Sequence, residues 1–197
     1  MGSAAMQRNI EITTGALAFF CILFYINPNG AFLPFVLASV AHELGHWAVC
    51  RLTGGRVDSL RVGMVGAQMQ AEFSSPASQV CSVLAGPAVN LLLAAVFLHI
   101  RFRFALINLF LAAYNLLPLL PLDGGRILQL LLWHIWPSGA DKTMKIVSVL
   151  VTAGIAVWCV VATCVWHYGL WPCFFAAILL LKTGGAMTEE KFLAKST

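Results

Sequence analysis

The residues Ala41–His46 contain the pattern His-Glu-x-x-His. On an α-helix, residues four apart leave the same face one turn apart, so His42 and His46 would present their imidazoles side by side. Two neutral imidazoles at this spacing can bind one Zn²⁺, and Glu43 beside them can take a proton from a water molecule. The pattern therefore predicts a metal site, with His42 and His46 as ligands and Glu43 as the general base.

The pattern lies within an apolar run from about residue 31 to residue 52. In soluble helices the same five residues also occur by chance. Ionisable side chains inside an apolar run that enters a membrane are costly unless they are paired or used in function. The surroundings of His42, Glu43 and His46 therefore favour a functional metal site over a chance match.

A catalytic zinc site needs a third protein ligand and an open position for water. Asp123 is favoured because it follows Pro118 and Pro121 at the end of an apolar run, where irregular backbone can line a polar cavity. A carboxylate and two imidazoles are also an ordinary set of catalytic zinc ligands. By spacing alone, however, Asp123 could equally cap a helix that begins near Gly124. The other candidates are Asp58, Glu72, His99, His134 and His167.

The composition indicates a membrane protein, because 60% of the 197 residues are apolar and only 10% are charged. Soluble domains carry about 25% charged residues. A spanning helix needs roughly 20 apolar residues, so we expect an all-α polytopic membrane protein with about six transmembrane helices. The apolar runs cover residues 10–26, 31–52, 76–100, 102–117, 146–166 and 170–181.

Two stretches between these runs have a different character. Residues 57–73 alternate in polarity, which predicts a short β-hairpin or extended segment between the second and third spans. Residues 127–136 are apolar but short, and could form an interfacial helix or continue the fourth run. We expect a single domain over residues 1–197, with the catalytic core spans in 10–126. Residues 127–197 would hold the interfacial helix, the fifth and sixth spans and the tail.

The basic residues predict the orientation, because loops on the cytoplasmic side of a membrane carry more Lys and Arg. With the N-terminus in the cytoplasm, only Arg101 and Arg103 lie in outer segments. Both termini and the opening of the active site are then expected to be cytoplasmic. The basic residues form no stripe, so we expect no nucleic-acid partner. Those on the cytoplasmic side are Arg8, Arg51, Arg56, Arg61, Arg126, Lys142, Lys145, Lys182, Lys191 and Lys195.

Three motifs together resemble the site-2 protease family of intramembrane zinc metalloproteases. They are His42–His46, Gly86–Asn90 and Asn115–Arg126, in the order found in that family. The resemblance implies that His42, His46 and Asp123 bind zinc and that Glu43 is the catalytic acid and base. The substrate would be a membrane-associated or transmembrane protein.

The resemblance also includes two asparagines, Asn90 and Asn115, which match family asparagines near the active site. An amide within an apolar run must find hydrogen-bonding partners there. Each of these two could serve helix–helix packing, or it could hold substrate and support the transition state.

The small size of the chain resembles the sporulation-type branch of the family, represented by stage IV sporulation protein FB. That likeness implies regulated intramembrane proteolysis of a membrane-tethered pro-protein such as a pro-sigma factor, under the control of regulatory membrane proteins.

A metal-ion transporter is the alternative, because transporters also place His, Asp and Glu inside spans. A transport path would need further ligands along its length, and His99, His134 and His167 are isolated. An inactive scaffold is a second alternative. The complete set of His42, Glu43, His46 and Asp123 favours an enzyme over both.

Overall fold

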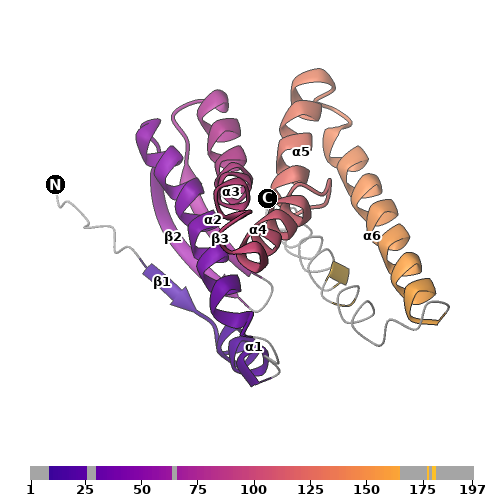
Figure 1. Ribbon diagram of the computed structural model, residues 1–197. Coiled ribbons are helices and arrows are strands. Elements are labelled where there is room, and N and C mark those ends of the chain that lie inside the picture. The colour runs from indigo at the N-terminus through magenta and orange to yellow at the C-terminus, as the bar shows by residue number, and fades with distance from the viewer. Residues whose placement is uncertain (1–8, 26–29, 64–65, 165–176, 178, 181–197) are drawn as a thin grey trace. The chain divides into compact units, whose positions relative to one another are not determined.

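The computed structural model describes residues 9–25, 30–63, 66–164, 177 and 179–180. The chain divides into two compact units, Met1–Tyr114 and Asn115–Thr197 (Figure 1). Helices predominate in both units, and a small sheet lies in the first. The predicted class, mainly helical with one short β-hairpin, therefore holds for the described chain, and the hairpin is extended by one further strand.

The sheet has three strands in the order β1-β2-β3. β2 (Arg56–Gly63) and β3 (Gly66–Glu72) form an antiparallel hairpin, with a register shift beside Asp58. This confirms the hairpin predicted over residues 57–73. The sequence did not reveal β1 (Asn9–Ile12), which pairs in parallel with the far edge of β2.

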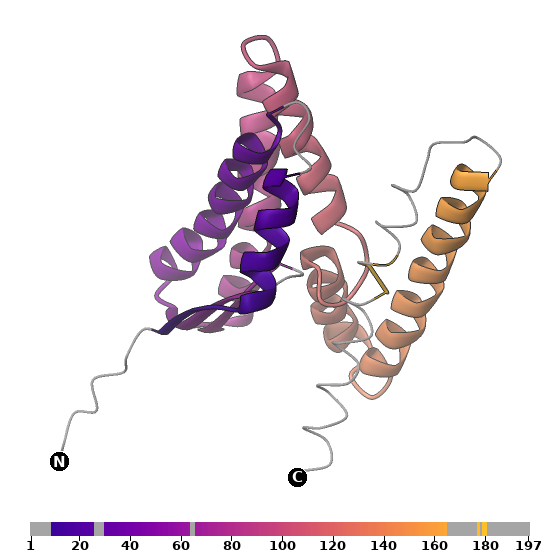
Figure 2. The same ribbon diagram turned by 90° about the horizontal axis from the view of Figure 1, so that it is seen from below.

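The first predicted span is therefore shorter than expected. Residues 9–12 belong to β1, and the chain continues through Thr13 directly into α1 (Thr14–Tyr25), as Figure 2 shows. The hydroxyl of Thr13 accepts a hydrogen bond from the N–H of Ala16 at 3.2 Å, which caps the first turn of α1. The prediction failed here because an apolar run does not reveal whether its first residues will pair with a distant strand.

α2 (Phe32–Leu52) and α3 (Pro76–Phe97) pack side by side in the first unit. Their backbones approach closely, since a Cβ on Gly45 of α2 would lie 2.9 Å from the carbonyl oxygen of Ala85 on α3. Buried residues recur every four positions along each helix, which places each series on one face. These residues are Ala38, His42, His46 and Cys50 on α2, and Ser78, Ser82, Gly86 and Asn90 on α3.

α4 (Phe102–Asn115) follows α3 after a short turn. The rings of Phe97 and Phe104 meet edge to face across that turn, with centroids 5.1 Å apart. Asn108 is fully buried, and its amide nitrogen donates to the carbonyl oxygen of Phe104 at 2.9 Å. The helix ends at Asn115, before the segment that contains Pro118 and Pro121.

The second unit contains α5 (Asp123–Ile135) and α6 (Ala140–Cys164), which pack against each other. The predicted stretch 127–136 is thus most of α5. Residues 116–122 are not helical, so α5 does not simply continue α4. One carboxylate oxygen of Asp141 on α6 accepts hydrogen bonds from Gln129 and Trp133 on α5, at 3.0 and 2.9 Å.

Two helices of the described chain, α3 and α6, are both long enough and apolar enough to cross a membrane. α2 has 21 residues, a length of about 31 Å at 1.5 Å per residue, but it also carries His42, Glu43, His46 and Arg51. The predicted sixth run, residues 170–181, lies outside the described residues except at 177, 179 and 180. Six spans therefore remain a prediction.

Candidate metal centre

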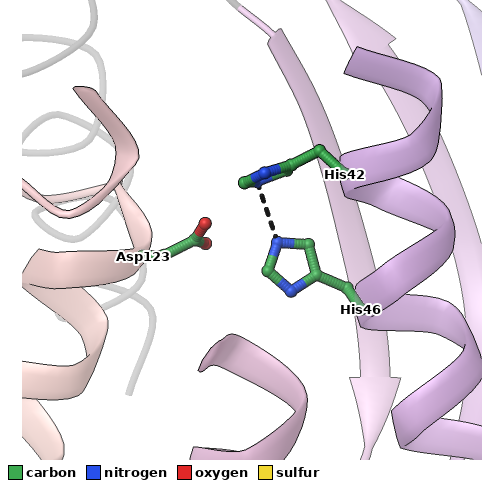
Figure 3. Close-up of side chains that lie close together, drawn as sticks. All are labelled: His42, His46 and Asp123. Carbon is green, nitrogen blue, oxygen red and sulfur yellow. Dashed lines mark hydrogen bonds between the residues drawn. The ribbon is translucent and has the colours of Figure 1, made fainter. Parts of the chain in front are cut away.

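The two histidines of the His-Glu-x-x-His pattern converge on one point. Nε2 of His42 and Nε2 of His46 lie 3.1 Å apart (Figure 3). Two nitrogens that bind one tetrahedral zinc at 2.0–2.1 Å would lie about 3.3 Å apart. Both side chains are buried, with 5% and 8% of their surface exposed. The α2 helix thus presents the pair as the spacing predicted, in a geometry that suits one metal ion.

His46 is held by a pair of hydrogen bonds to Ser82 on α3. Nδ1 of His46 lies 2.7 Å from the carbonyl oxygen of Ser82, which can only accept, so Nδ1 carries the proton and donates. In return, the hydroxyl of Ser82 donates to the carbonyl oxygen of His46 at 3.0 Å. In a neutral imidazole with a proton on Nδ1, the lone pair is on Nε2, the atom that faces His42.

Gly86 on α3 lies directly against the two histidine rings. A Cβ built on Gly86 would lie 2.3 Å from Nε2 of His46 and 2.8 Å from Nε2 of His42. A side chain at this position would therefore collide with both imidazole rings unless α2 and α3 moved apart. Glycine at position 86 is thus what allows α3 to lie so close to the histidine pair.

Asp123 is buried, with 8% of its surface exposed, and is the first residue of α5. The residue at the N-cap position is Leu122, so Asp123 lies inside the helix and not at its cap. The interpretation of Asp123 as the cap of a helix beginning near Gly124 is therefore wrong. Its position allows a role as a ligand.

The loop before α5 folds tightly against the first turn of that helix. A Cβ on Gly124 would lie 2.2 Å from the carbonyl oxygen of Leu116, and one on Gly125 would lie 2.3 Å from that of Leu119. The N–H of Leu120 donates to the hydroxyl of Ser148 on α6 at 3.2 Å. These contacts within the second unit determine where α5 starts and hence the position of Asp123.

Among the described residues, three potential ligands group together: His42, His46 and Asp123. Each offers one ligand atom, and these atoms all lie within 4.8 Å of one another (Figure 3). The other candidates for a third ligand, Asp58, Glu72, His99 and His134, are not in this group. His167 lies outside the described residues.

The remaining predicted site residues are Glu43, Asn90 and Asn115. Glu43 is half-buried on α2, next to His42 in the chain. Asn90 is fully buried on α3, and among the described residues neither polar atom of its amide has a hydrogen-bonding partner. Asn115 is half-buried at the end of α4. Nothing in their geometry assigns a chemical role to these three residues.

Sequence reasoning missed Ser82 and did not give Gly86 a role of its own. Both residues lie on the face of α3 that also carries Asn90, at intervals of four. That interval was visible in the sequence. It could not show that the face meets the two histidines, because this depends on how α3 packs against α2.

Comparisons with known proteins identify the family. Residues 97–161 match the model of peptidase family M50. Several relatives carry the name "Putative zinc metalloprotease". Rip3 of Mycobacterium tuberculosis is 28% identical over 160 residues, 68% of this chain and 41% of Rip3. MJ0611 of Methanocaldococcus jannaschii is 30% identical over 173 residues, 67% of this chain and 88% of MJ0611. The chain belongs to peptidase family M50.

A solved structure supports the same fold. The site-2 protease from Methanocaldococcus jannaschii superposes with a TM-score of 0.68, over 94% of this chain and 93% of that protein, at 18% identity. This likeness shows the fold, and together with the match to peptidase family M50 and the zinc metalloprotease relatives it supports the resemblance to the site-2 protease family. The sporulation-type branch within that family stays a prediction. The chain spans less than half the length of the curated relatives that it matches first, for example 41% of Rip3.

Proposed function

We propose that this chain is a membrane-embedded zinc metalloprotease that hydrolyses peptide bonds of membrane-associated or transmembrane proteins. The observation that carries the proposal is the convergence of Nε2 of His42 and Nε2 of His46, 3.1 Å apart, next to Gly86. Asp123 serves as the third ligand. Two imidazoles and one carboxylate leave a fourth position open, as catalytic zinc sites require.

The chemistry is shared between the metal and Glu43. Zinc, when bound, supplies a Lewis acid that polarises a peptide carbonyl and makes water more acidic. Glu43, which follows His42 in the chain, takes a proton from the attacking water and delivers it to the nitrogen of the departing fragment. His42, His46 and Asp123 hold the metal in place and take no part in the proton transfer.

The membrane topology belongs to the same proposal. The apolar helices α3 and α6 support it, as does the membership of family M50. About six spans with both termini in the cytoplasm would place ten of the twelve Lys and Arg residues on the cytoplasmic side. A site in the cytoplasmic half of the membrane would give water a short route to Glu43.

The substrate would be a membrane-tethered protein that unwinds locally so that a carbonyl reaches the metal. β3 (Gly66–Glu72) supports a mode of binding, because it is an edge strand of the sheet. An extended segment of the substrate can add to such an edge through main-chain hydrogen bonds. In its most specific form, the proposal is that the chain cleaves a pro-sigma factor and that regulatory membrane proteins control this cleavage, as in sporulation. If proline substitutions along β3 left cleavage unchanged, β3 would not be the strand that binds the substrate.

Asn90 and Asn115 are proposed to hold substrate or to support the transition state. A fully buried amide with no partner is costly, and Asn90 is such an amide within the described residues. A substrate backbone or a water molecule near the site would satisfy it.

The experiment compares the wild-type chain with Glu43→Gln in lipid vesicles that contain a membrane-tethered substrate. Glu43→Gln is expected to retain zinc and to lower the cleavage rate by about 10²–10⁴-fold, the usual contribution of a general base. Cleavage at near-normal rate by Glu43→Gln would contradict the role assigned to Glu43. Zinc uptake into the vesicles without any cleavage by the wild type would favour a transporter instead.

A further inference from the structure

Ser82 makes two hydrogen bonds to a single residue of the neighbouring helix. Its carbonyl oxygen accepts from Nδ1 of His46 at 2.7 Å, and its hydroxyl donates to the carbonyl oxygen of His46 at 3.0 Å. Ser82 is almost completely buried, with 1% of its surface exposed. Water therefore cannot easily replace either bond, and the two together hold both the ring and the backbone of His46.

The bond to the ring selects one tautomer of His46. The position of the proton on a ligating imidazole is set by the hydrogen bond that its other nitrogen makes. With Nδ1–H donating to Ser82, the lone pair of His46 lies on Nε2, the atom that lies 3.1 Å from Nε2 of His42. The opposite tautomer would put a proton where the metal has to bind.

The carbonyl group of Ser82 belongs to a residue inside α3. A carbonyl oxygen has two lone pairs. The carbonyl of Ser82 can therefore bond to His46 even where it also accepts a hydrogen bond within the helix.

We propose that Ser82 is a positioning residue of the metal site, which keeps His46 in the Nδ1–H tautomer and its Nε2 turned toward the metal. This inference rests on the proposed function in one respect, the identity of the bound metal as zinc. Such contacts behind a ligand typically contribute about 10–100-fold to metal affinity. Ser82→Ala removes the hydroxyl and keeps the carbonyl, so about tenfold weaker zinc binding is expected.

The test uses the full chain in lipid nanodiscs with ¹⁵N-labelled histidine. The resonances of His46 are assigned from the spectrum of His46→Gln. In the zinc-free wild type, we expect His46 in the Nδ1–H tautomer, whereas free neutral imidazole in water exchanges between both. A zinc-free His46 with its proton on Nε2 would overturn the proposal, whether or not the protein cleaves any substrate.

Zinc affinity measured by competition with a chelator provides the second readout, and Ser78→Ala is the matched control. Ser78 is another buried serine on the same face of α3, and it bonds to Thr53 at 2.5 Å. Ser82→Ala should weaken zinc binding about tenfold while Ser78→Ala leaves it unchanged. Ser82→Thr, which keeps a hydroxyl, should bind more tightly than Ser82→Ala. Equal loss in Ser82→Ala and Ser78→Ala, or no loss in either, would contradict the proposal.

Discussion

A Cβ on Gly86 would lie 2.3 Å from Nε2 of His46, far too close for any side chain to be accommodated without a shift. The glycine therefore lies against the candidate metal site, although it offers no ligand. It comes from α3, while the two histidines come from α2. The close packing of these helices is thus a condition for metal binding, and several predictions depend on it.

Gly86→Ala is expected to abolish zinc binding. The added methyl group would collide with the rings of His42 and His46, so the two histidines would have to move away from the positions in which their Nε2 atoms converge. Zinc content of the purified protein, measured by atomic absorption, checks this.

The matched control for Gly86→Ala is Gly154→Ala on α6, where an added Cβ would meet no atom within 4 Å. Alanine is about 1 kcal/mol better than glycine inside a helix, so this variant should keep its zinc and lose no stability. A Gly86→Ala protein with a full complement of zinc would show that the metal lies elsewhere.

Gly125→Ala is expected to disturb Asp123 without touching the histidine pair. The Cβ would lie 2.3 Å from the carbonyl oxygen of Leu119 and 2.7 Å from the backbone nitrogen of Leu120, so the loop before α5 would have to shift. Overpacking of this kind costs about 1–3 kcal/mol. We expect a lower melting temperature and weaker zinc binding than in the wild type.

Asp123→Asn provides the comparison for Gly125→Ala. It should weaken zinc binding because it removes the anionic ligand, and it should leave the loop before α5 undisturbed. If Asp123→Asn keeps the zinc affinity of the wild type, Asp123 is not a ligand, and the effect of Gly125→Ala must have another origin.

Removal of zinc is expected to lower the stability of the folded chain. A ligand present at 1,000 times its Kd stabilises the folded state by about 4 kcal/mol. Thermal unfolding in nanodiscs with zinc, and again after treatment with a chelator, should therefore differ clearly. Gly86→Ala should unfold at the same temperature in both conditions. A shift in that variant as large as in the wild type would mean that zinc stabilises the protein through another site.

Asp141→Ala is expected to loosen the packing of α5 against α6. It removes the acceptor for Gln129 and for the indole N–H of Trp133. Each bond contributes about 0.5–1.5 kcal/mol, and exposed bonds belong at the low end. A loss of about 1–2 kcal/mol in the free energy of unfolding is therefore expected. Lys142→Ala, at the neighbouring exposed position, should have a much smaller effect. Equal losses in both variants would show that these two bonds do not matter for stability.

The sequence by itself was sufficient to identify the pair of candidate metal ligands. The spacing of His42 and His46 needs only the periodicity of one helix, and that periodicity is a local property. Alternation over residues 57–73 predicted the hairpin for the same reason, because its two strands are neighbours in the chain. The high apolar content similarly favoured a membrane protein, because composition does not depend on how the chain folds.

Only the tertiary structure determined which distant segments meet. Nothing in Asn9–Ile12 shows that these residues pair with β2, since their partners lie far along the chain. Spacing left Asp123 undecided between ligand and helix cap, and the start of α5 at that residue decided against the cap. The contacts of Ser82 and Gly86 with His46 depend on the packing of α3 against α2, which no local pattern encodes. Such contacts depend on the register between paired strands and on how closely two helices approach. Both are decided only when the whole chain packs.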